Sequence, residues 1–293
     1  MKIFLFLLCI AFTLPAPAQD SIPVTIKGRL NADINNETSG LAASSVNKGL
    51  LYIHNDSGDT SRFFLIGTDG TLKAIYTFKA GSLIRNGVTD CEDIAVSTGP
   101  KGKRYIYIGD IGDNNAKRKY ITVYRIKEPK LKSSANVFTG QVNAEPLYLK
   151  YPDGARDAET LMVDPVEKLF YIISKREDSV SVYTAPLLYK QNDTVILTKR
   201  ATLFFEGGNS GKWICGGDIS KDGGQVLVKN YLKAFYWKRK GKEPIWQLLM
   251  TPPLEMPYKA EQQGEAIGFA RDGNGYYTIS EGVYPEVYYY KTP

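Results

Sequence analysis

The sequence has few of the residues on which the commoner catalytic and metal sites depend. Among its 293 residues it contains one histidine, His54, and three cysteines. These low counts exclude a disulfide-dense scaffold and the usual zinc sites. Any mechanism of the Ser-His-Asp or Cys-His type would have to use His54. This single ring is therefore the candidate for any imidazole chemistry.

The chain also lacks a strong excess of charge of one sign. Lys and Arg number 37 against 31 Asp and Glu, which gives a net charge of +6. The densest basic stretch, residues 233–242, is typical of an exposed strand pair, so we expect no nucleic-acid partner. No apolar run reaches the roughly 18 residues that a membrane span needs, so we expect no stable membrane insertion.

The N-terminus is typical of a secretory signal peptide. Met1-Lys2 is a short positive region, residues 3–14 are mostly apolar, and Ala16-Pro17-Ala18 supplies an Ala-x-Ala cleavage site. We predict a signal peptide over residues 1–18 and a propeller domain, described below, over residues 19–293. The protein is then exported to the periplasm or outside the cell, and its source is expected to be bacterial. The remaining cysteines, Cys91 and Cys215, form either one disulfide or two buried thiols.

The body of the chain repeats one pattern five times. Hydrophobic residues make up 43% of the sequence, which is enough to bury a core. Each copy begins with an acidic residue and continues with a Tyr- and Ile-rich strand, a polar loop and a second aromatic strand. The copies begin at Glu37, Glu92, Glu159, Asp218 and Glu265, with spacings of 55, 67, 59 and 47 residues.

Repeats of this length fit sheets of four short strands, with turns such as Asp222-Gly223 and Asp272-Gly273 between them. Fourth strands are predicted over residues 72–78, 144–151, 198–205 and 245–251. The last copy lacks one, and residues 23–30 are predicted to supply it and close the ring, which protects the edge strands. We therefore predict an all-β fold, a single β-propeller of five blades of four strands closed by an N-terminal strand. Six blades is the alternative, if a long repeat hides an extra sheet.

In a propeller the inner strand of each blade lines a central channel, so the five acidic residues are expected to meet at one mouth. Carboxylates gathered around one axis repel each other unless a cation neutralises them. Oxygen-rich sites suit calcium, which takes about 6–8 oxygen ligands. The pattern predicts a calcium site formed by Glu37, Glu92, Glu159, Asp218 and Glu265. The alternative is that each carboxylate caps its own blade by accepting backbone N–H bonds.

The repeat starts carry a family resemblance. The segments Glu37-Thr-Ser-Gly-Leu, Asp90-Cys-Glu-Asp-Ile-Ala, Asp157-Ala-Glu-Thr-Leu, Gly217-Asp-Ile-Ser and Gln263-Gly-Glu-Ala-Ile resemble the Glu-Gly-Ile-Ala-type repeats of the SdiA-regulated family. They are also similar to those of the wider phytase-like and gluconolactonase-like propellers. The resemblance covers residues 35–290 and implies a secreted or periplasmic propeller with calcium at the channel mouth. The five acidic residues are the positions that match.

Two functions fit this pattern. The first is a non-catalytic, monomeric propeller that binds a small anionic ligand, a glycan or a protein, with the metal ion holding the blades together. The alternative is a calcium-dependent hydrolase of an ester, lactone or phosphoester, in which the ion polarises the reacting oxygen. His54 or Asp56 would then be the general base. In either case the predicted contacts to an anion are Arg118, Lys175, Arg176 and Lys229.

Overall fold

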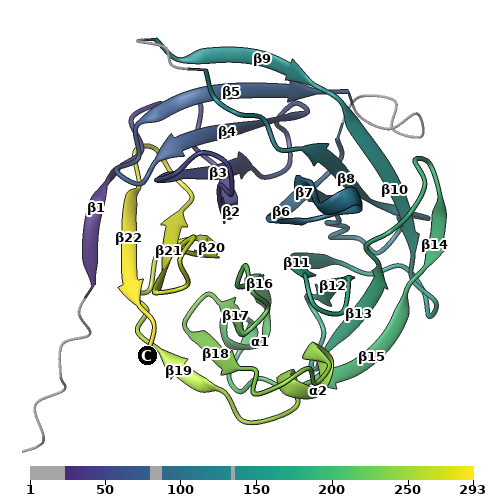
Figure 1. Ribbon diagram of the computed structural model, residues 1–293. Coiled ribbons are helices and arrows are strands. Elements are labelled where there is room, and N and C mark those ends of the chain that lie inside the picture. Colours follow the sequence, from purple (N-terminus) through teal and green to yellow (C-terminus); the bar gives the residue numbers. More distant parts are fainter. Residues whose placement is uncertain (1–23, 80–87, 133–135) are drawn as a thin grey trace, which may run out of the picture.

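The computed structural model describes residues 24–79, 88–132 and 136–293, which form a ring of five β-sheets (Figure 1). The innermost strands β2, β6, β11, β16 and β20 face the centre of the ring, and each sheet extends outward from its inner strand. The prediction of a five-bladed propeller is confirmed, and no sixth sheet occurs in the described ranges. The predicted signal peptide of residues 1–18 lies outside the described residues.

The first four strands of each blade pair antiparallel in a meander, and the inner strands are buried on both faces. Blade 1 contains β2 (Thr38–Ala43), β3 (Leu50–Asn55), β4 (Arg62–Gly67) and β5 (Leu72–Phe78). Blade 2 contains β6 (Cys91–Thr98), β7 (Arg104–Asp110), β8 (Ile121–Lys127) and β10 (Ala144–Lys150). Blade 3 contains β11 (Ala158–Asp164), β12 (Leu169–Ser174), β13 (Val180–Pro186) and β15 (Thr198–Leu203). Blade 4 contains β16 (Ile214–Ile219), β17 (Gln225–Asn230), β18 (Ala234–Lys238) and β19 (Leu254–Met256).

Blade 5 is completed by the start of the described chain. Its strands are β20 (Gly264–Phe269), β21 (Gly275–Ser280), β22 (Glu286–Lys291) and β1 (Thr25–Arg29). β1 pairs antiparallel with β22, with Thr25 opposite Tyr289 and Arg29 opposite Glu286. The predicted N-terminal closing strand is therefore confirmed, and the first and last strands of the described chain are joined in one sheet.

Two blades have a fifth strand, which explains the two longest repeats. β9 (Phe138–Val142) leaves blade 2 and pairs parallel with β5 at the outer edge of blade 1. β14 (Thr194–Ile196) leaves blade 3 and pairs parallel with β10 at the outer edge of blade 2. The additional residues thus extend the neighbouring blade instead of forming a sixth one.

The strand predicted over residues 245–251 is wrong, because this segment forms the helix α2 (Ile245–Leu249). Pro244 precedes the helix, and Ile245 and Leu249, four residues apart, are its buried side chains. The fourth strand of blade 4 is instead β19, which begins after Pro252-Pro253. The other short helical segments are η1 (Pro100–Gly102) and α1 (Asn209–Lys212).

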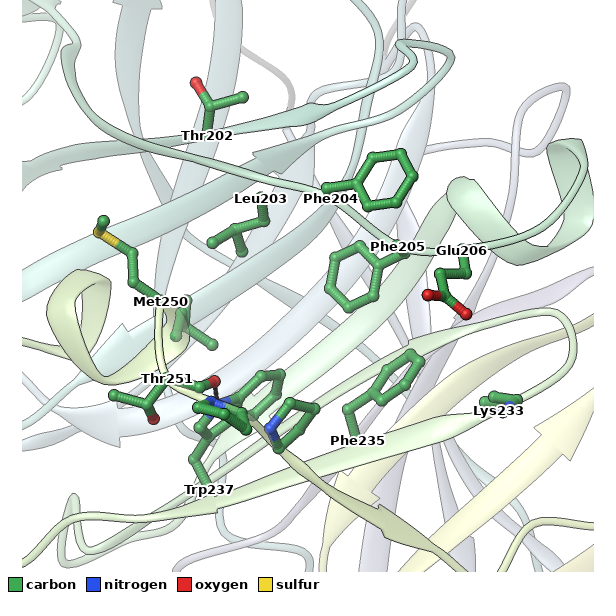
Figure 2. A pocket seen from close by; sticks show the side chains of 13 residues that line it. Thr202, Leu203, Phe204, Phe205, Glu206, Lys233, Phe235, Trp237, Met250 and Thr251 are labelled. Carbon is green, nitrogen blue, oxygen red and sulfur yellow. Dashed lines mark hydrogen bonds between the residues drawn. The ribbon is translucent and has the colours of Figure 1, made fainter.

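Blade 3 has no fifth strand, and a groove of about 540 Å³ lies between its outer strand and blade 4 (Figure 2). Phe205 and Phe235 face each other in this groove with ring centroids 4.9 Å apart. The indole N–H of Trp237 donates to the carbonyl oxygen of Thr251, 2.9 Å away. The groove is built from β15, β18 and the segment after α2, so it belongs to the outer part of the ring and not to the channel.

Aromatic side chains fill the space between neighbouring blades. Tyr107 of blade 2 meets Phe170 of blade 3 edge to face, with centroids 5.2 Å apart, and both are fully buried. Burying a large apolar side chain contributes on the order of 2–3 kcal/mol. This contact joins the two blades through their second strands, β7 and β12.

Candidate cation site at the channel mouth

Every inner strand has a β-bulge at the same place. In each blade the register with the second strand shifts by one residue near the start of the inner strand. The residues skipped by the pairing are Ser39, Glu92, Glu159, Cys215 and Glu265. Bulges redirect side chains and often adjoin functional sites. Here they place three glutamates at equivalent positions around the channel.

A second set of equivalent residues follows the second strand of the blades. The backbone N–H groups of Asp56, Gly112, Lys175 and Glu281 each donate to a carbonyl oxygen two residues before a bulge, at 2.7, 3.1, 2.9 and 2.9 Å. Tyr231 directly follows the second strand of blade 4, and its N–H donates to the carbonyl oxygen of Ser210 at 3.2 Å. The side chains after the second strands therefore lie beside the bulge residues.

Gly112 leaves room for carboxylates where other blades have a side chain. A Cβ atom at this position would lie 2.1 Å from Oε1 of Glu92 and 2.4 Å from Oδ2 of Asp90. Both distances are far shorter than a van der Waals contact, so the two carboxylates occupy the space that a side chain would fill. The absence of a side chain at Gly112 thus helps to bring Asp90 and Glu92 together.

Six carboxyl groups gather at the mouth in three overlapping sets. Within each set, one oxygen per residue lies within 4.8 Å of the others. The sets are Asp56, Asp90 and Glu92; Asp56, Glu265 and Glu281; and Glu92, Glu159 and Glu265. They share members, so the six groups form one continuous acidic cluster, which we call the mouth cluster.

Burial makes ionisation of this cluster costly. Burial raises the pKa of Asp56 to about 7, and the charges of Glu265 and Asp90 add to the effect. The pKa of Asp90 is raised to about 6 by burial and by Asp157, and that of Glu281 to about 8 by burial and by Glu265. Burial and the charge of Glu159 raise the pKa of Glu92 well above its usual range. The cluster therefore favours bound protons or a bound cation over free negative charge.

Four carboxylate oxygens of the cluster have no hydrogen-bond partner among the described residues. They belong to four buried residues that are at most 8% exposed: Oδ1 of Asp90 and Oε2 of Glu92, Glu159 and Glu265. Buried polar atoms are normally paired, because an unpaired one loses its hydration without compensation. Carboxylate oxygens close together and without donors are the ligands that calcium or magnesium prefers. The donor set therefore fits a hard divalent cation.

One ammonium group enters the cluster. Nζ of Lys175 pairs with Oε1 of Glu159, lies 3.8 Å from Oε1 of Glu265 and donates to the Tyr231 hydroxyl at 2.8 Å. That hydroxyl donates in turn to Oε1 of Glu265 at 2.5 Å. Burial opposes the charge of Lys175, but Glu159 and Glu265 keep its pKa above the usual value. Lys175 is therefore a buried cation in one part of the cluster.

The sequence-predicted acidic residues fall into two groups. Glu92, Glu159 and Glu265 meet in the cluster. Glu37 lies two residues before the bulge of blade 1 and is exposed. Asp218 lies three residues after the bulge of blade 4, and its carboxylate accepts the N–H groups of Ile219 and Phe269, both at 2.8 Å. The positions equivalent to the three glutamates in these blades are Ser39 and Cys215.

The four predicted anion contacts are all paired within the chain. Besides Lys175 in the cluster, Arg118 binds Asp110 at 2.8 Å and the carbonyl oxygen of Gly112 at 2.7 Å. Arg176 binds Asp157 at 2.6 Å, and its guanidinium lies over the Trp213 ring, with the carbon 5.0 Å from the centroid. The Lys229 ammonium is fully buried, donates to the carbonyl oxygen of Gly264 and lies 3.3 Å from Sγ of Cys215. Of these side chains, that of Arg176 is the most open to solvent.

His54 is buried against the backbone of its own blade. Its Nδ1 donates to the carbonyl oxygen of Asn55 at 2.8 Å, and its Nε2 has no partner among the described residues. Burial lowers the pKa of His54 to about 4, so the ring is neutral at pH 7. The ring is only 1% exposed. Asp56, the other predicted base, belongs to the mouth cluster.

Sequence reasoning missed three members of the site: Asp90, Tyr231 and Gly112. A signal for the bulge was present, because Leu41, Ile94, Leu161 and Ile267 each follow a bulge residue by two positions. Aligning the repeats on these apolar residues would have replaced Glu37 with Ser39. Blade 4 has Gly217 at this position, so it gives no such signal.

Both described cysteines, Cys91 and Cys215, are buried free thiols. Within the described residues, no helix has the length and apolar character needed to cross a membrane.

Comparison with known proteins leaves the family open. No family model matches the sequence, and no match is found among curated proteins. The propeller fold implied by the resemblance to SdiA-regulated and phytase-like propellers is present, while neither comparison names those families.

Proposed function

We propose that this protein is an exported β-propeller that binds a divalent cation, calcium, at the channel mouth and uses it to hold a ligand there without chemical turnover. The observation that carries the proposal is the pair of unpartnered, buried carboxylate oxygens of Asp90 and Glu92, which belong to one carboxyl set with Asp56. Export rests on the predicted signal peptide of residues 1–18.

The chemistry of the cluster favours calcium over softer ions. All ligand atoms in the three sets are carboxylate oxygens, and no histidine or cysteine belongs to them. Zinc sites normally include nitrogen or sulfur ligands, whereas calcium binds 6–8 oxygens in flexible arrangements. The ligand is expected to be anionic or rich in hydroxyl groups, because such groups complete the coordination of a hard cation.

Binding is favoured over hydrolysis by the position of His54. A general base must reach the proton that it removes, either directly or through one water molecule. The 1% exposed ring of His54 is closed to a dissolved substrate, and its low pKa makes it a weak base. The Arg176 guanidinium, at the rim beside Trp213, is the best-placed side chain for contact with an anionic ligand.

The test is thermal unfolding of the protein in EDTA and in excess Ca²⁺. An ion that binds only the folded state at a hundredfold excess over Kd stabilises it by about 2.7 kcal/mol. For a chain of this size that corresponds to a rise in Tm of roughly 5–10 °C. We expect Glu92→Gln to remove most of the rise, because it removes a carboxylate shared by two of the three sets.

The matched control is Asp178→Asn. This carboxylate pairs with Lys212 at 2.8 Å, and its side chain is 95% exposed. The control should show the full calcium-dependent rise. Equal Tm values in EDTA and Ca²⁺ for the unsubstituted protein, or an undiminished rise in Glu92→Gln, would contradict the proposal.

A further inference from the structure

The mouth cluster is neutralised on one side only. Glu159 and Glu265 contact the Lys175 ammonium, and Glu265 also accepts the Tyr231 hydroxyl. In contrast, no described lysine or arginine forms an ion pair with Asp56, Asp90, Glu92 or Glu281. The cluster thus has a side that holds a cation of the chain itself and a side that holds none.

Lys175 is built into its position. It follows β12, its backbone N–H donates to the carbonyl oxygen of Asp157 at 2.9 Å, and its residue is 3% exposed. The Tyr231 hydroxyl fixes the ammonium further at 2.8 Å. An ammonium and a metal ion cannot occupy the same group of carboxylate oxygens, because both need the same lone pairs.

On the other side, Asp56 belongs to two of the three carboxyl sets, as Glu92 and Glu265 also do, and unlike Glu265 it forms no described ion pair. One of these sets includes Glu92, whose Oε2 is buried and has no partner in the described chain. The third set, Glu92, Glu159 and Glu265, includes both carboxylates that Lys175 contacts.

We propose that the Lys175 ammonium is a built-in cation that fills the position between Glu159 and Glu265, so that the mouth takes a single divalent ion beside Asp56. Removing Lys175 opens a second divalent position at Glu92, Glu159 and Glu265. Lys175 is thus a residue that sets the stoichiometry of the site, and Asp56 is a metal ligand. This inference rests on the proposed calcium binding.

The experiment is a calorimetric calcium titration of the protein and of Lys175→Met, each first stripped of metal. We expect one ion per chain in the unsubstituted protein and two in Lys175→Met. One ion in both, or two in the unsubstituted protein, would overturn the role of Lys175 and leave calcium binding intact. No ion in either would overturn both the proposed function and this inference.

One further outcome would support the role of Lys175 and contradict the proposed calcium binding. If the unsubstituted protein binds no calcium while Lys175→Met binds one ion, the ammonium is confirmed as an internal cation and the proposed function fails. Lys175→Arg, which keeps the charge, should bind one ion. A second ion in this variant would show that a positive charge at position 175 does not exclude it.

A second variant covers the case in which Lys175→Met does not fold. Glu159→Gln combined with Lys175→Met removes both partners of the closer ion pair, and Glu265 keeps the Tyr231 hydroxyl as its donor. We expect this double variant to bind one ion with an affinity within threefold of the unsubstituted protein, because the side containing Asp56 is unchanged. A tenfold or greater loss of affinity would place the ion at Glu159 and overturn the inference.

Discussion

The two ends of strand β11 hold buried carboxylates in opposite states. At its far end, both oxygens of Asp164 are bound by the Arg239 guanidinium, at 3.1 and 2.7 Å. They also accept the backbone N–H groups of Val166 and Glu167, at 2.9 and 3.1 Å. At the mouth end, Glu159 has only the Lys175 ammonium, and its Oε2 has no described partner.

The pKa values of the two residues follow this difference. Burial opposes the ionisation of Asp164, but the hydrogen bonds from Arg239 and the backbone hold its pKa below the usual range. Burial raises the pKa of Glu159 well above its usual range, even though Lys175 lies beside it. A bidentate guanidinium donates hydrogen bonds to both oxygens of a buried carboxylate and balances its charge, whereas the mouth cluster still lacks positive charge. The first arrangement supports the fold, and the second is suited to binding a cation.

Removing the guanidinium should produce the largest effect. Arg239→Met leaves the fully buried Asp164 without its charge partner, and breaking a buried pair in this way costs about 3–5 kcal/mol. We expect a loss of that size in the free energy of unfolding, measured by urea denaturation. Added Ca²⁺ should not restore this loss, because the backbone N–H groups still occupy the Asp164 oxygens.

Lys175→Met is the matched comparison at the mouth end. It also removes the cationic partner of a buried carboxylate, but here Ca²⁺ should restore most of the lost stability. The distinction between the two ends of β11 would be wrong if Ca²⁺ restored the stability of Arg239→Met. It would also be wrong if Ca²⁺ failed to restore the stability of a folded Lys175→Met.

The pH dependence of stability should separate the mouth from the rest of the molecule. Because the folded pKa of Asp56 is about 7 against an ordinary 3.8, the folded state holds this proton over that interval while the unfolded state loses it. Stability then falls as pH rises from about 4 to 7. Three pKa units correspond to about 4 kcal/mol, and the partial exposure of Asp56 reduces the expected effect to about 2 kcal/mol.

Asp56→Asn isolates this contribution. In EDTA, the variant should equal the unsubstituted protein at pH 4 and be more stable by about 2 kcal/mol at pH 7.5. His54, whose pKa is about 4, titrates in the same interval with the opposite sign, but it is present in both proteins and cancels in the difference. In Ca²⁺ the order should reverse, because the variant lacks a ligand. A difference that does not change with pH in EDTA would show that Asp56 ionises freely at the mouth.

The sequence was sufficient for the propeller because its determinants are local and repeated. Alternating strands, Asp-Gly turns and five acidic starts are visible without the structure, and the closing strand follows from counting strands. The segment 245–251 was misjudged because seven residues, of which five form α2, are too few for periodicity to separate a strand from a helix.

The mouth cluster could be predicted only in part, because its geometry depends on the bulges. A bulge shifts by one residue which side chain faces the channel. Composition does not reveal this shift, and in the sequence it is indicated only by the apolar residue two positions later. Glu92, Glu159 and Glu265 were found because the acidic residue of those copies is itself the bulge residue. Lys175 was predicted as a contact to an anion, and only the structure shows that its charge is already paired with Glu159.

The smallest of these effects should come from a single methyl group at the mouth. In Gly112→Ala the new Cβ would meet the carboxylates of Glu92 and Asp90 at 2.1 and 2.4 Å, so both must move. We expect calcium affinity to fall about tenfold, which corresponds to about 1.4 kcal/mol, measured by calorimetry. Gly208→Ala is the matched control, since it has φ of −73° and no heavy atom within 4 Å of its Cβ position. Unchanged affinity in Gly112→Ala would mean that the ion does not depend on the Asp90–Glu92 pair, and would move its position toward Glu265 and Glu281.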